Sequence, residues 1–147
     1  MLSELTTNQK GAIAETAAIA AATRLGVEVY RPVAEGGRFD FIFLWRERLL
    51  RVQCKWAARR GDTMVVPMYS ARRTATGITR RFYDPSEVDA FAAYCADLDR
   101  CYLLPIEEFA GRTAAHLRLA PCRNNQQRKV NWAADYEFQA KLRGAGP

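Results

Sequence analysis

Apolar residues follow a helical period in the first part of the chain. Alanines and isoleucines return every three or four positions over residues 8–25, which predicts a helix that is capped by Thr6, Thr7 or Asn8 and ends at Gly26. β-branched and aromatic residues then predict a series of strands. These strands cover residues 27–31, 38–45, 49–57 and 63–69, and the second and third form a hairpin with a tight turn at Arg46-Glu47.

The second half of the chain alternates between strand and helix signals. Residues 70–81 are polar and basic, and they form either a hairpin or a loop around Gly77. The stretch Asp84-Pro85-Ser86-Glu87 has the residues of a capped helix start, and it predicts a helix from there to Cys95. A strand at 100–106, a short one at 117–119, a polar loop at 123–131 and a helix at 132–142 complete the order. This order predicts an α/β, mixed α+β domain with a central mixed β-sheet flanked by helices.

The composition suits one intracellular globular domain. The chain has 147 residues, of which 49% are hydrophobic and 26% are charged, enough for one core. We see no signal peptide and no apolar run long enough to cross a bilayer, so we expect no membrane partner. The four cysteines form no CxxC pair, which argues against zinc, and three lie in apolar segments. This favours reduced thiols over disulfides in a cytoplasmic protein.

The net charge of +6 is concentrated in two segments. Residues 41–85 carry a net charge of +7 and residues 121–147 carry +3, whereas residues 1–40 and 86–120 carry −1 and −3. Such a distribution is typical of a surface that meets a polyanion such as nucleic acid. The charge pattern alone leaves open that both segments are simply solvated faces.

Strand alternation gathers polar side chains on one face of the predicted hairpin. The three phenylalanines of residues 39–43 share one face of the first strand, and Asp40 lies on the other. In the second strand the apolar residues 52, 54 and 56 share one face, and Gln53 and Lys55 share the opposite one. A turn at Arg46-Glu47 pairs residue 45 with 48 and residue 40 with 53. Asp40 then faces Gln53, with Lys55 on the diagonal.

Glu15 adds a second carboxylate to this group. It lies at the helical spacing of Ala12 and Ala22, in the small apolar stripe that we expect to pack on the sheet. A carboxylate there has to be paired, protonated or bound to metal. Such a set suits Mg²⁺, with Glu15, Asp40 and Gln53 as ligands and Lys55 acting on a bound water or on the phosphate. The simpler alternatives are solvated strand positions and a boundary salt bridge from Glu15 to Lys10 or Arg38.

The same residues resemble the PD-(D/E)XK nuclease superfamily. The likeness rests on Glu15 in the first helix, on Asp40 in Gly37-Arg38-Phe39-Asp40, and on Gln53-Cys54-Lys55. It extends over about residues 10–142, through segments 82–94, 99–105, 124–126 and 131–138. More narrowly, the chain resembles the group I intron homing endonucleases of that class, in which a glutamine stands at the acidic position of the motif.

This resemblance implies a restriction-endonuclease-like core and a catalytic set of Glu15, Asp40, Gln53 and Lys55. It implies Mg²⁺ as the cofactor, with Mn²⁺ as a substitute, and a lower metal affinity because Gln53 is neutral. The segment around Gly77 would enter a DNA groove, and the polar segment after residue 123 would add a second contact. The expected DNA-binding residues are Arg72, Arg73, Arg80, Arg81, Asn124, Asn125, Gln126, Arg128 and Lys129.

We therefore expect a site-specific, Mg²⁺-dependent endodeoxyribonuclease that hydrolyses double-stranded DNA, with intron homing as its role. Alternatives are a Holliday junction resolvase or a restriction or repair nuclease on the same fold, and a catalytically inactive DNA-binding module. A double-strand break needs two sites of this kind, so we expect a homo-oligomer, a dimer or tetramer. Its interface would use the helices predicted at 86–95 and 132–142. We expect the protein in the cytoplasm, associated with the nucleoid if the host is bacterial.

Overall fold

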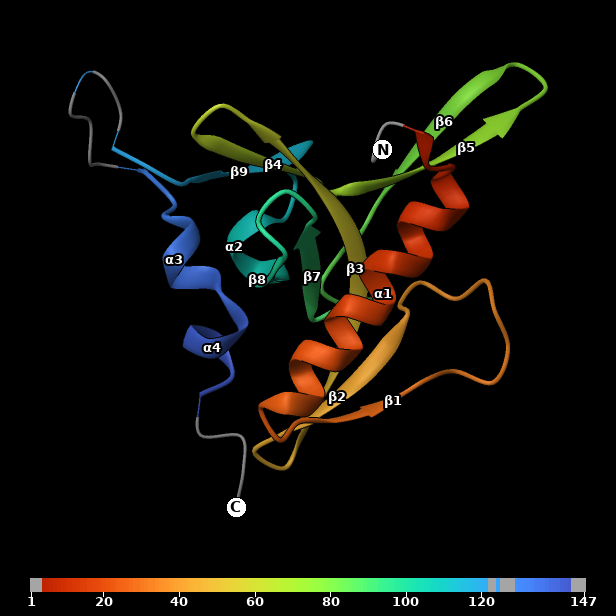
Figure 1. The fold of residues 1–147 in the computed structure, drawn as a ribbon. Coiled ribbons are helices and arrows are strands. Elements are labelled where there is room, and N and C mark those ends of the chain that lie inside the picture. Colours follow the sequence, from red (N-terminus) through yellow and green to blue (C-terminus); the bar gives the residue numbers. More distant parts are fainter. Residues whose placement is uncertain (1–3, 122–123, 125–128, 144–147) are drawn as a thin grey trace.

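Helix α1 (Thr7–Arg24) lies across one face of a central sheet in the computed structural model, which describes residues 4–121, 124 and 129–143 (Figure 1). Within this part of the chain the sheet has seven strands and is mixed, because β7 pairs with β3 in parallel and the other pairs are antiparallel. Its main path runs through β1 (Glu28–Tyr30), β2 (Phe41–Trp45), β3 (Arg48–Arg60), β4 (Thr63–Pro67) and β9 (Ala114–Arg118), and β7 (Ala90–Cys95) joins β3 to β8 (Arg100–Pro105). The mixed α+β fold class is as predicted.

Two buried clusters sit on opposite faces of this sheet. One contains α1 with β2 and the alternate side chains of β3, and the other contains β4, β9 and the short helices α2 (Ile106–Phe109) and α3 (Ala133–Tyr136). β3 is long enough to serve both clusters, since Val52 packs with α1 and Ala57 packs in the other cluster. Gln53 and Lys55 alternate with Val52 and Cys54 along β3, so their side chains point away from the cluster that contains α1.

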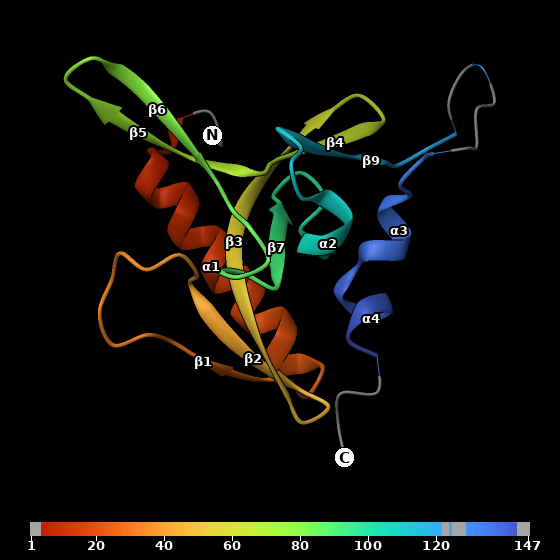
Figure 2. The same cartoon turned by 180° about the vertical axis from the view of Figure 1, so that it is seen from behind.

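A separate hairpin projects from this body. It consists of β5 (Tyr69–Thr74) and β6 (Gly77–Phe82), which pair only with each other among the described strands. The sequence left residues 70–81 open between a hairpin and a loop, and the hairpin is the observed form. It lies on the same side of the molecule as the long loop between β1 and β2 in both views (Figures 1 and 2).

The helix α1 begins as predicted, with a slightly different buried stripe. The Thr6 hydroxyl accepts from the Gln9 N–H, and the Gln9 side-chain oxygen accepts from the Thr6 N–H, which forms a complete capping box. Ala14, Ala18 and Ala22 are the buried residues, whereas the predicted stripe through Ala12 and Glu15 is wrong, because Ala12 is exposed. Glu15 is therefore half-buried at the edge of the contact with the sheet.

The β2–β3 hairpin has the predicted two-residue turn. Arg46 and Glu47 both adopt positive φ values, 49° and 63°, which is the backbone of a type I′ turn. Residue 45 pairs with residue 48, and the register continues as predicted to the pair Phe41 and Val52. β2 then ends: the Asp40 N–H donates to the Val52 carbonyl at 2.8 Å, and Phe39 packs against the opposite buried cluster from Phe41. The prediction of one shared phenylalanine face is therefore wrong at its first member.

The helix predicted from Asp84 to Cys95 is wrong. The Asp84 carboxylate does accept from the Ser86 N–H at 2.8 Å, and the Asp84 carbonyl accepts from the Val88 N–H at 3.2 Å, but only this one turn forms. Residues 90–95 instead form β7, and all six are buried between β3 and β8. A strand that is buried on both faces shows a continuous apolar run, so alternation gave no sign of it.

The last predicted helix is also interrupted. α3 ends at Tyr136, and Glu137 has an extended backbone (φ −55°, ψ 146°) before α4 (Phe138–Lys141) begins. Glu137 also makes a β-bridge to Tyr102, which satisfies backbone groups that a continuous helix would use internally. The predicted strand at 117–119 is β9, which starts earlier, at Ala114.

The cysteines behave as predicted where they are described. Cys54, Cys95 and Cys101 are buried free thiols; Cys122 lies outside the described residues. No helix within the described segments is long and apolar enough to cross a membrane.

Candidate active site

Asp40 sits where β2 leaves the sheet. Its Oδ2 accepts a hydrogen bond from the Cys54 N–H at 2.7 Å, so β3 fixes the carboxylate from the side. Burial raises the pKa of Asp40, and this outweighs the Cys54 hydrogen bond and the nearby charge of Lys55, which both lower it. The carboxylate is thus held rigidly in a place that disfavours its negative charge.

Glu15 approaches Asp40 from helix α1. Burial raises the pKa of Glu15, and the charge of Asp40 raises it further. The two carboxylates line one hollow of about 450 Å³ with Phe39 and residues 31–37, which we call the acidic hollow. The Arg31 guanidinium partly compensates this charge, at 3.5 Å from Glu15. The alternative foreseen for Glu15 was a salt bridge to Lys10 or Arg38; the observed partner is Arg31 instead, and this pair lies inside the candidate site.

Lys55 is the half-buried cation of the site. Its Nζ donates to the Tyr69 carbonyl at 2.7 Å and lies 4.8 Å from the centre of the Tyr83 ring. Burial lowers the pKa of Lys55 to about 8, although the charge of Asp40 acts in the opposite direction. A lysine that is desolvated in this way is available both to hold a phosphate oxygen and to exchange a proton near neutral pH.

Gln53 lies on the same face of β3 as Lys55 but borders a different hollow. Its Nε2 donates to the Cys54 carbonyl at 3.4 Å. It lines a hollow of about 670 Å³ whose other walls are Arg38, Tyr83 and the β5–β6 hairpin, which we call the hairpin hollow. The two hollows meet at Gly36 and Gly37, which line both. The structure thus brings Glu15, Asp40 and Lys55 into electrostatic contact and places Gln53 at the entrance from the hairpin side.

The two faces of the β5–β6 hairpin differ in chemistry. The register pairs Ser70 with Arg81 and Arg72 with Thr79, so these four residues share one face, and all four line the hairpin hollow together with Arg73. The other face is aromatic: Arg80 lies 4.6 Å from the centre of the Tyr69 ring, and this ring packs edge-on against Phe82. The four arginines predicted to bind DNA are all exposed, but three of them border the hollow and Arg80 does not.

Comparisons with known proteins agree with this geometry. A family model described as PD-(D/E)XK endonuclease matches residues 5–139. The chain belongs to the PD-(D/E)XK endonuclease family. The solved structure of a bacterial homing endonuclease, I-Ssp6803I, is similar with a TM-score of 0.76 and 27% sequence identity, over 94% of this chain and 93% of that chain. A search of curated proteins gave no match.

Membership of this endonuclease family confirms the predicted resemblance and the restriction-endonuclease-like fold. Family members typically use divalent metals, and the chemistry of the donor set can be tested against that need. Glu15 and Asp40 offer carboxylates whose ionised forms are disfavoured, a cost that a cation would relieve. Mg²⁺ prefers an octahedral set of oxygen ligands, so the two carboxylates would need neutral oxygens beside them. A glutamine amide or a main-chain carbonyl meets that requirement, so the residues fit Mg²⁺.

The second predicted DNA segment lies apart from this site. Asn124 and Lys129 are described, whereas Asn125, Gln126 and Arg128 lie outside the described residues. β9 and α3, which flank the segment, lie on the side of the molecule away from the β5–β6 hairpin (Figure 2).

Four residues of the site had no role in the sequence-based prediction: Arg31, Arg38, Tyr69 and Tyr83. Arg38 is part of the motif stretch before Asp40, but alternation says nothing about what its side chain contacts. Arg31 was foreseen only as the end of a strand. Tyr69 contributes a backbone carbonyl, for which no residue type gives a signal.

Proposed function

We propose that this endonuclease is a site-specific, Mg²⁺-dependent endodeoxyribonuclease that cuts double-stranded DNA, and that it acts in homing. The observation that carries the proposal is the desolvated pair of carboxylates, Glu15 and Asp40, beside the half-buried Lys55 in a chain of this family. The similar bacterial homing endonuclease supports the narrower role. The protein would act where DNA is, in the cytoplasm and on the nucleoid of a bacterial host.

Each residue has a distinct part in the proposed chemistry. Glu15, Asp40 and the amide oxygen of Gln53 would hold Mg²⁺, or Mn²⁺ in its place, and such an ion would supply Lewis-acid chemistry at the scissile phosphate and at a water. Lys55 donates from Nζ to a phosphate oxygen or orients the water. The Cys54 N–H keeps the Asp40 carboxylate aimed into the site through its 2.7 Å hydrogen bond.

The DNA approaches through the hairpin hollow. The polar face with Arg72 and Arg81 lies against a groove, where arginine reads guanine edges and holds phosphates. Arg73 and Arg80 add charge at the rim. Asn124, Asn125, Gln126, Arg128 and Lys129 serve as a distant second contact, on the same duplex or on the part of it that a second subunit carries.

The enzyme works as a homo-oligomer, a dimer or a tetramer. One site cuts one strand, and a single module of this size buries only ~600–1,000 Å² on DNA. The interface does not use the predicted helix at 86–95, because residues 90–95 are a buried strand. The C-terminal segment is a weak candidate too, since Phe138 and Leu142 are buried in the core.

A plasmid assay tests the proposal directly. The purified protein is incubated with a plasmid library carrying random inserts, with Mg²⁺ or with EDTA. We expect linear products from a subset of plasmids with Mg²⁺, and none with EDTA or with Asp40→Asn, which keeps the oxygen that accepts from Cys54. Cleavage confined to four-way junctions would favour a resolvase. Tight duplex binding without cleavage in Mg²⁺ or Mn²⁺ would contradict the proposal and favour an inactive DNA-binding module.

A further inference from the structure

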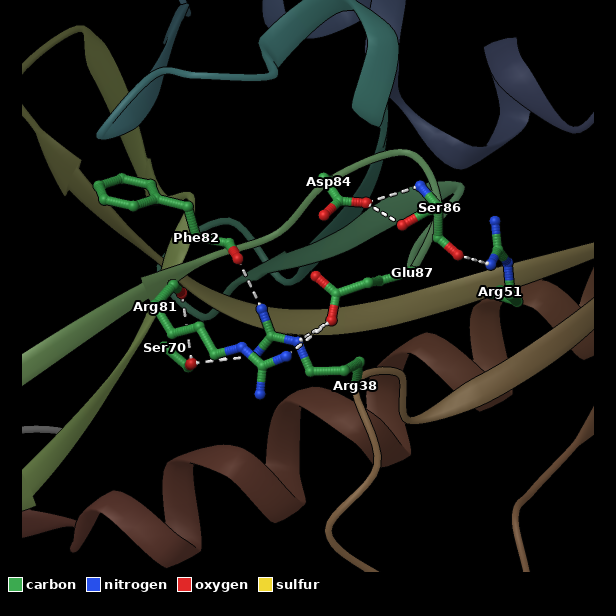
Figure 3. A network of polar contacts seen from close by, with 8 residues as sticks. All are labelled: Arg38, Arg51, Ser70, Arg81, Phe82, Asp84, Ser86 and Glu87. Atoms are coloured by element: carbon green, nitrogen blue, oxygen red, sulfur yellow. Dashed lines mark hydrogen bonds and ion pairs between the residues drawn. The ribbon is translucent and has the colours of Figure 1, made fainter.

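Arg38, which lies two residues before Asp40, contacts both strands of the β5–β6 hairpin. Its Nη2 donates to the Phe82 carbonyl at 2.7 Å, its Nη1 to the Ser70 hydroxyl at 3.2 Å, and its Nε to Glu87 at 2.9 Å (Figure 3). Its guanidinium carbon lies 3.9 Å from the centre of the Tyr83 ring. The side chain is only 20% exposed, so this guanidinium is committed to the protein and has little freedom to bind DNA itself.

Lys55 holds the other strand of the same hairpin at the same level. Phe82 and Tyr69 are register partners at the base of the hairpin. Arg38 donates a hydrogen bond to the carbonyl of Phe82, and Lys55 donates one to the carbonyl of Tyr69, each at 2.7 Å. The base of the hairpin is thus held on both strands by hydrogen bonds, one from Arg38 and one from Lys55.

Tyr83 lies between these two cations. Arg38 and Lys55 both approach its ring, at 3.9 Å and 4.8 Å from the ring centre, and the ring is 6% exposed. A buried aromatic ring that contacts two cations transmits a shift of one to the other through packing. The position of the Lys55 ammonium therefore depends on Arg38 as well as on the hairpin.

The loop that follows the hairpin is clamped in the same way. Glu87 accepts from Arg38 and, at 3.1 Å, from Arg81, which is itself 66% exposed. On the far side of this loop, Arg51 donates to the Ser86 carbonyl (Figure 3). Arg51 also makes a bidentate contact with Asp89 and donates to the Pro85 carbonyl. Arg51 lies two residues before Gln53, as Arg38 lies two residues before Asp40. Arg81 can exchange Glu87 for a phosphate while Arg38 keeps the loop in place.

We propose that Arg38 is a positioning residue for cleavage: it fixes the base of the β5–β6 hairpin so that DNA bound on the hairpin and the Lys55 ammonium have one fixed geometry. The inference rests on the proposed nuclease function and deepens it. It makes the hairpin part of the catalytic framework, and it predicts that a loose hairpin binds DNA but presents the scissile phosphate poorly.

The experiment compares Arg38→Met with Arg112→Met. Arg112 also stacks on an aromatic ring, 5.7 Å from the centre of Phe109, but belongs to no contact with the hairpin. The substrate is a duplex selected from the random library because the wild-type protein cuts it. Single-turnover cleavage is measured at saturating protein and Mg²⁺, and duplex affinity is measured with Ca²⁺. Hydrogen exchange of the amides of residues 69–82 reports hairpin order without any reference to activity.

We expect Arg38→Met to cleave roughly 100-fold more slowly, as a misplacement of about 1 Å does, with duplex affinity within about threefold of wild type. Added guanidinium should restore part of the rate, and hairpin amides should exchange faster. Arg112→Met should match the wild type in all three measurements. If Arg38→Met does not fold, Arg38→Lys, which keeps the charge but not the forked contacts, gives the same comparison.

Two results would overturn the inference. One is unchanged hairpin exchange in the Arg38 variant, whatever its activity. The other is a cleavage rate that recovers fully at saturating protein, because Arg38 would then act only on affinity. If the wild-type protein cuts no duplex, the proposed function fails, and the exchange measurement still decides whether Arg38 fixes the hairpin.

Discussion

Nη2 of Arg31 lies 3.5 Å from Oε1 of Glu15, and the charge of Arg31 lowers the pKa of both Glu15 and Asp40. The positive charge of Arg31 thus stabilises the ionised forms of the two carboxylates, as a bound divalent cation would. It is 59% exposed, so this compensation is weak and exchangeable. Metal binding and the Glu15–Arg31 ion pair are expected to compete.

Removal of Arg31 should therefore tighten metal binding in the absence of DNA. An exposed ion pair contributes about 0.2–1 kcal/mol, so Arg31→Met should bind Mn²⁺ roughly two- to fivefold more tightly than wild type. Calorimetric titration with Mn²⁺ measures this, with Arg24→Met at the end of α1 as the control. Equal or weaker affinity in Arg31→Met would show that the ion pair does not compete with metal.

Gln53 should control the metal requirement of the enzyme. Gln53→Ala removes a neutral oxygen ligand, so activity should fall and more Mg²⁺ should be needed for half-maximal cleavage. Gln53→Glu adds a negative charge next to the two carboxylates, and it should lower the Mg²⁺ requirement. Cleavage rates over a Mg²⁺ series give both values. A wild-type metal dependence in both variants would remove Gln53 from the metal shell.

Lys55 should lower the free energy of unfolding of the metal-free protein below pH 8. Burial lowers the pKa of Lys55 from its ordinary 10.5 to about 8 in the folded protein, so below pH 8 both states carry the proton and the folded state bears the full desolvation penalty. Between pH 8 and 10.5 the unfolded state binds more protons, and the free energy of unfolding of the wild type rises relative to Lys55→Met.

The Lys55→Met variant should accordingly be inactive but more stable at neutral pH, by at most about 3 kcal/mol. Chemical denaturation in EDTA at several pH values measures the difference. The advantage of the variant should shrink across the window from pH 8 to 10.5. A difference that stays constant with pH would mean that burial does not perturb Lys55.

The β2–β3 hairpin was the part of the site that the sequence predicted best. A two-residue turn needs positive φ at both positions, and Arg46-Glu47 adopts it even without glycine. The register that follows places Gln53 and Lys55 on one face, as alternation predicted. Only the predicted pairing of Asp40 with Gln53 fails, because the ladder ends at the pair Phe41 and Val52. Asp40 is hydrogen-bonded to Cys54 and Val52 instead. Local patterning cannot show where a strand ends.

The strand β7 shows why the rest was out of reach. Three of its six residues, Ala90, Ala92 and Ala93, are good helix formers and follow a good helix cap, and both local signals are real. The pairing of β7 with β3 and β8 overrides them, and those contacts are distant in sequence. The Arg38 contacts with Ser70, Phe82 and Glu87 are of the same kind, since they span 32 to 49 residues.

The two faces of the hairpin should separate base recognition from backbone contact. Arg72 lies on the polar face beside the hairpin hollow, whereas Arg80 stacks on Tyr69 on the opposite face. If Arg72 reads a base, Arg72→Ala should cost about 1–3 kcal/mol and relax preference at one position of the target. Arg80→Ala should weaken all sequences alike and flatten the salt dependence. Binding to single-base variants of the selected duplex at several salt concentrations distinguishes them. Equal, sequence-independent losses in both variants would contradict a reading role for Arg72.

Removal of the acidic partner of Arg81 should have the opposite effect on affinity. Glu87 is 19% exposed and holds both Arg38 and Arg81. Glu87→Gln should free Arg81 for phosphate and tighten binding to non-specific duplex. It should also lower the discrimination between target and non-target, because the loop behind the hairpin loosens. Unchanged non-specific affinity at low salt would argue against the exchange of Glu87 for phosphate.

Subunit mixing should reveal whether two sites act on one target. The part of the chain that the structure describes provides one candidate site, built on Glu15 and Asp40, and therefore one cut per subunit. A double-strand break needs a second subunit on the opposite strand, so a mass of two or four times 16.6 kDa is expected in sedimentation at micromolar concentration. Mixing wild type with an excess of Asp40→Asn should then convert linear plasmid products into nicked circles, because most assemblies carry one active and one inactive site. A control mixture with Arg112→Met, which lies away from both hollows, should leave the linear product unchanged. If the Asp40→Asn excess only slows cleavage without accumulating nicks, each subunit cuts independently, and a 16.6 kDa species on DNA would establish a monomeric nickase.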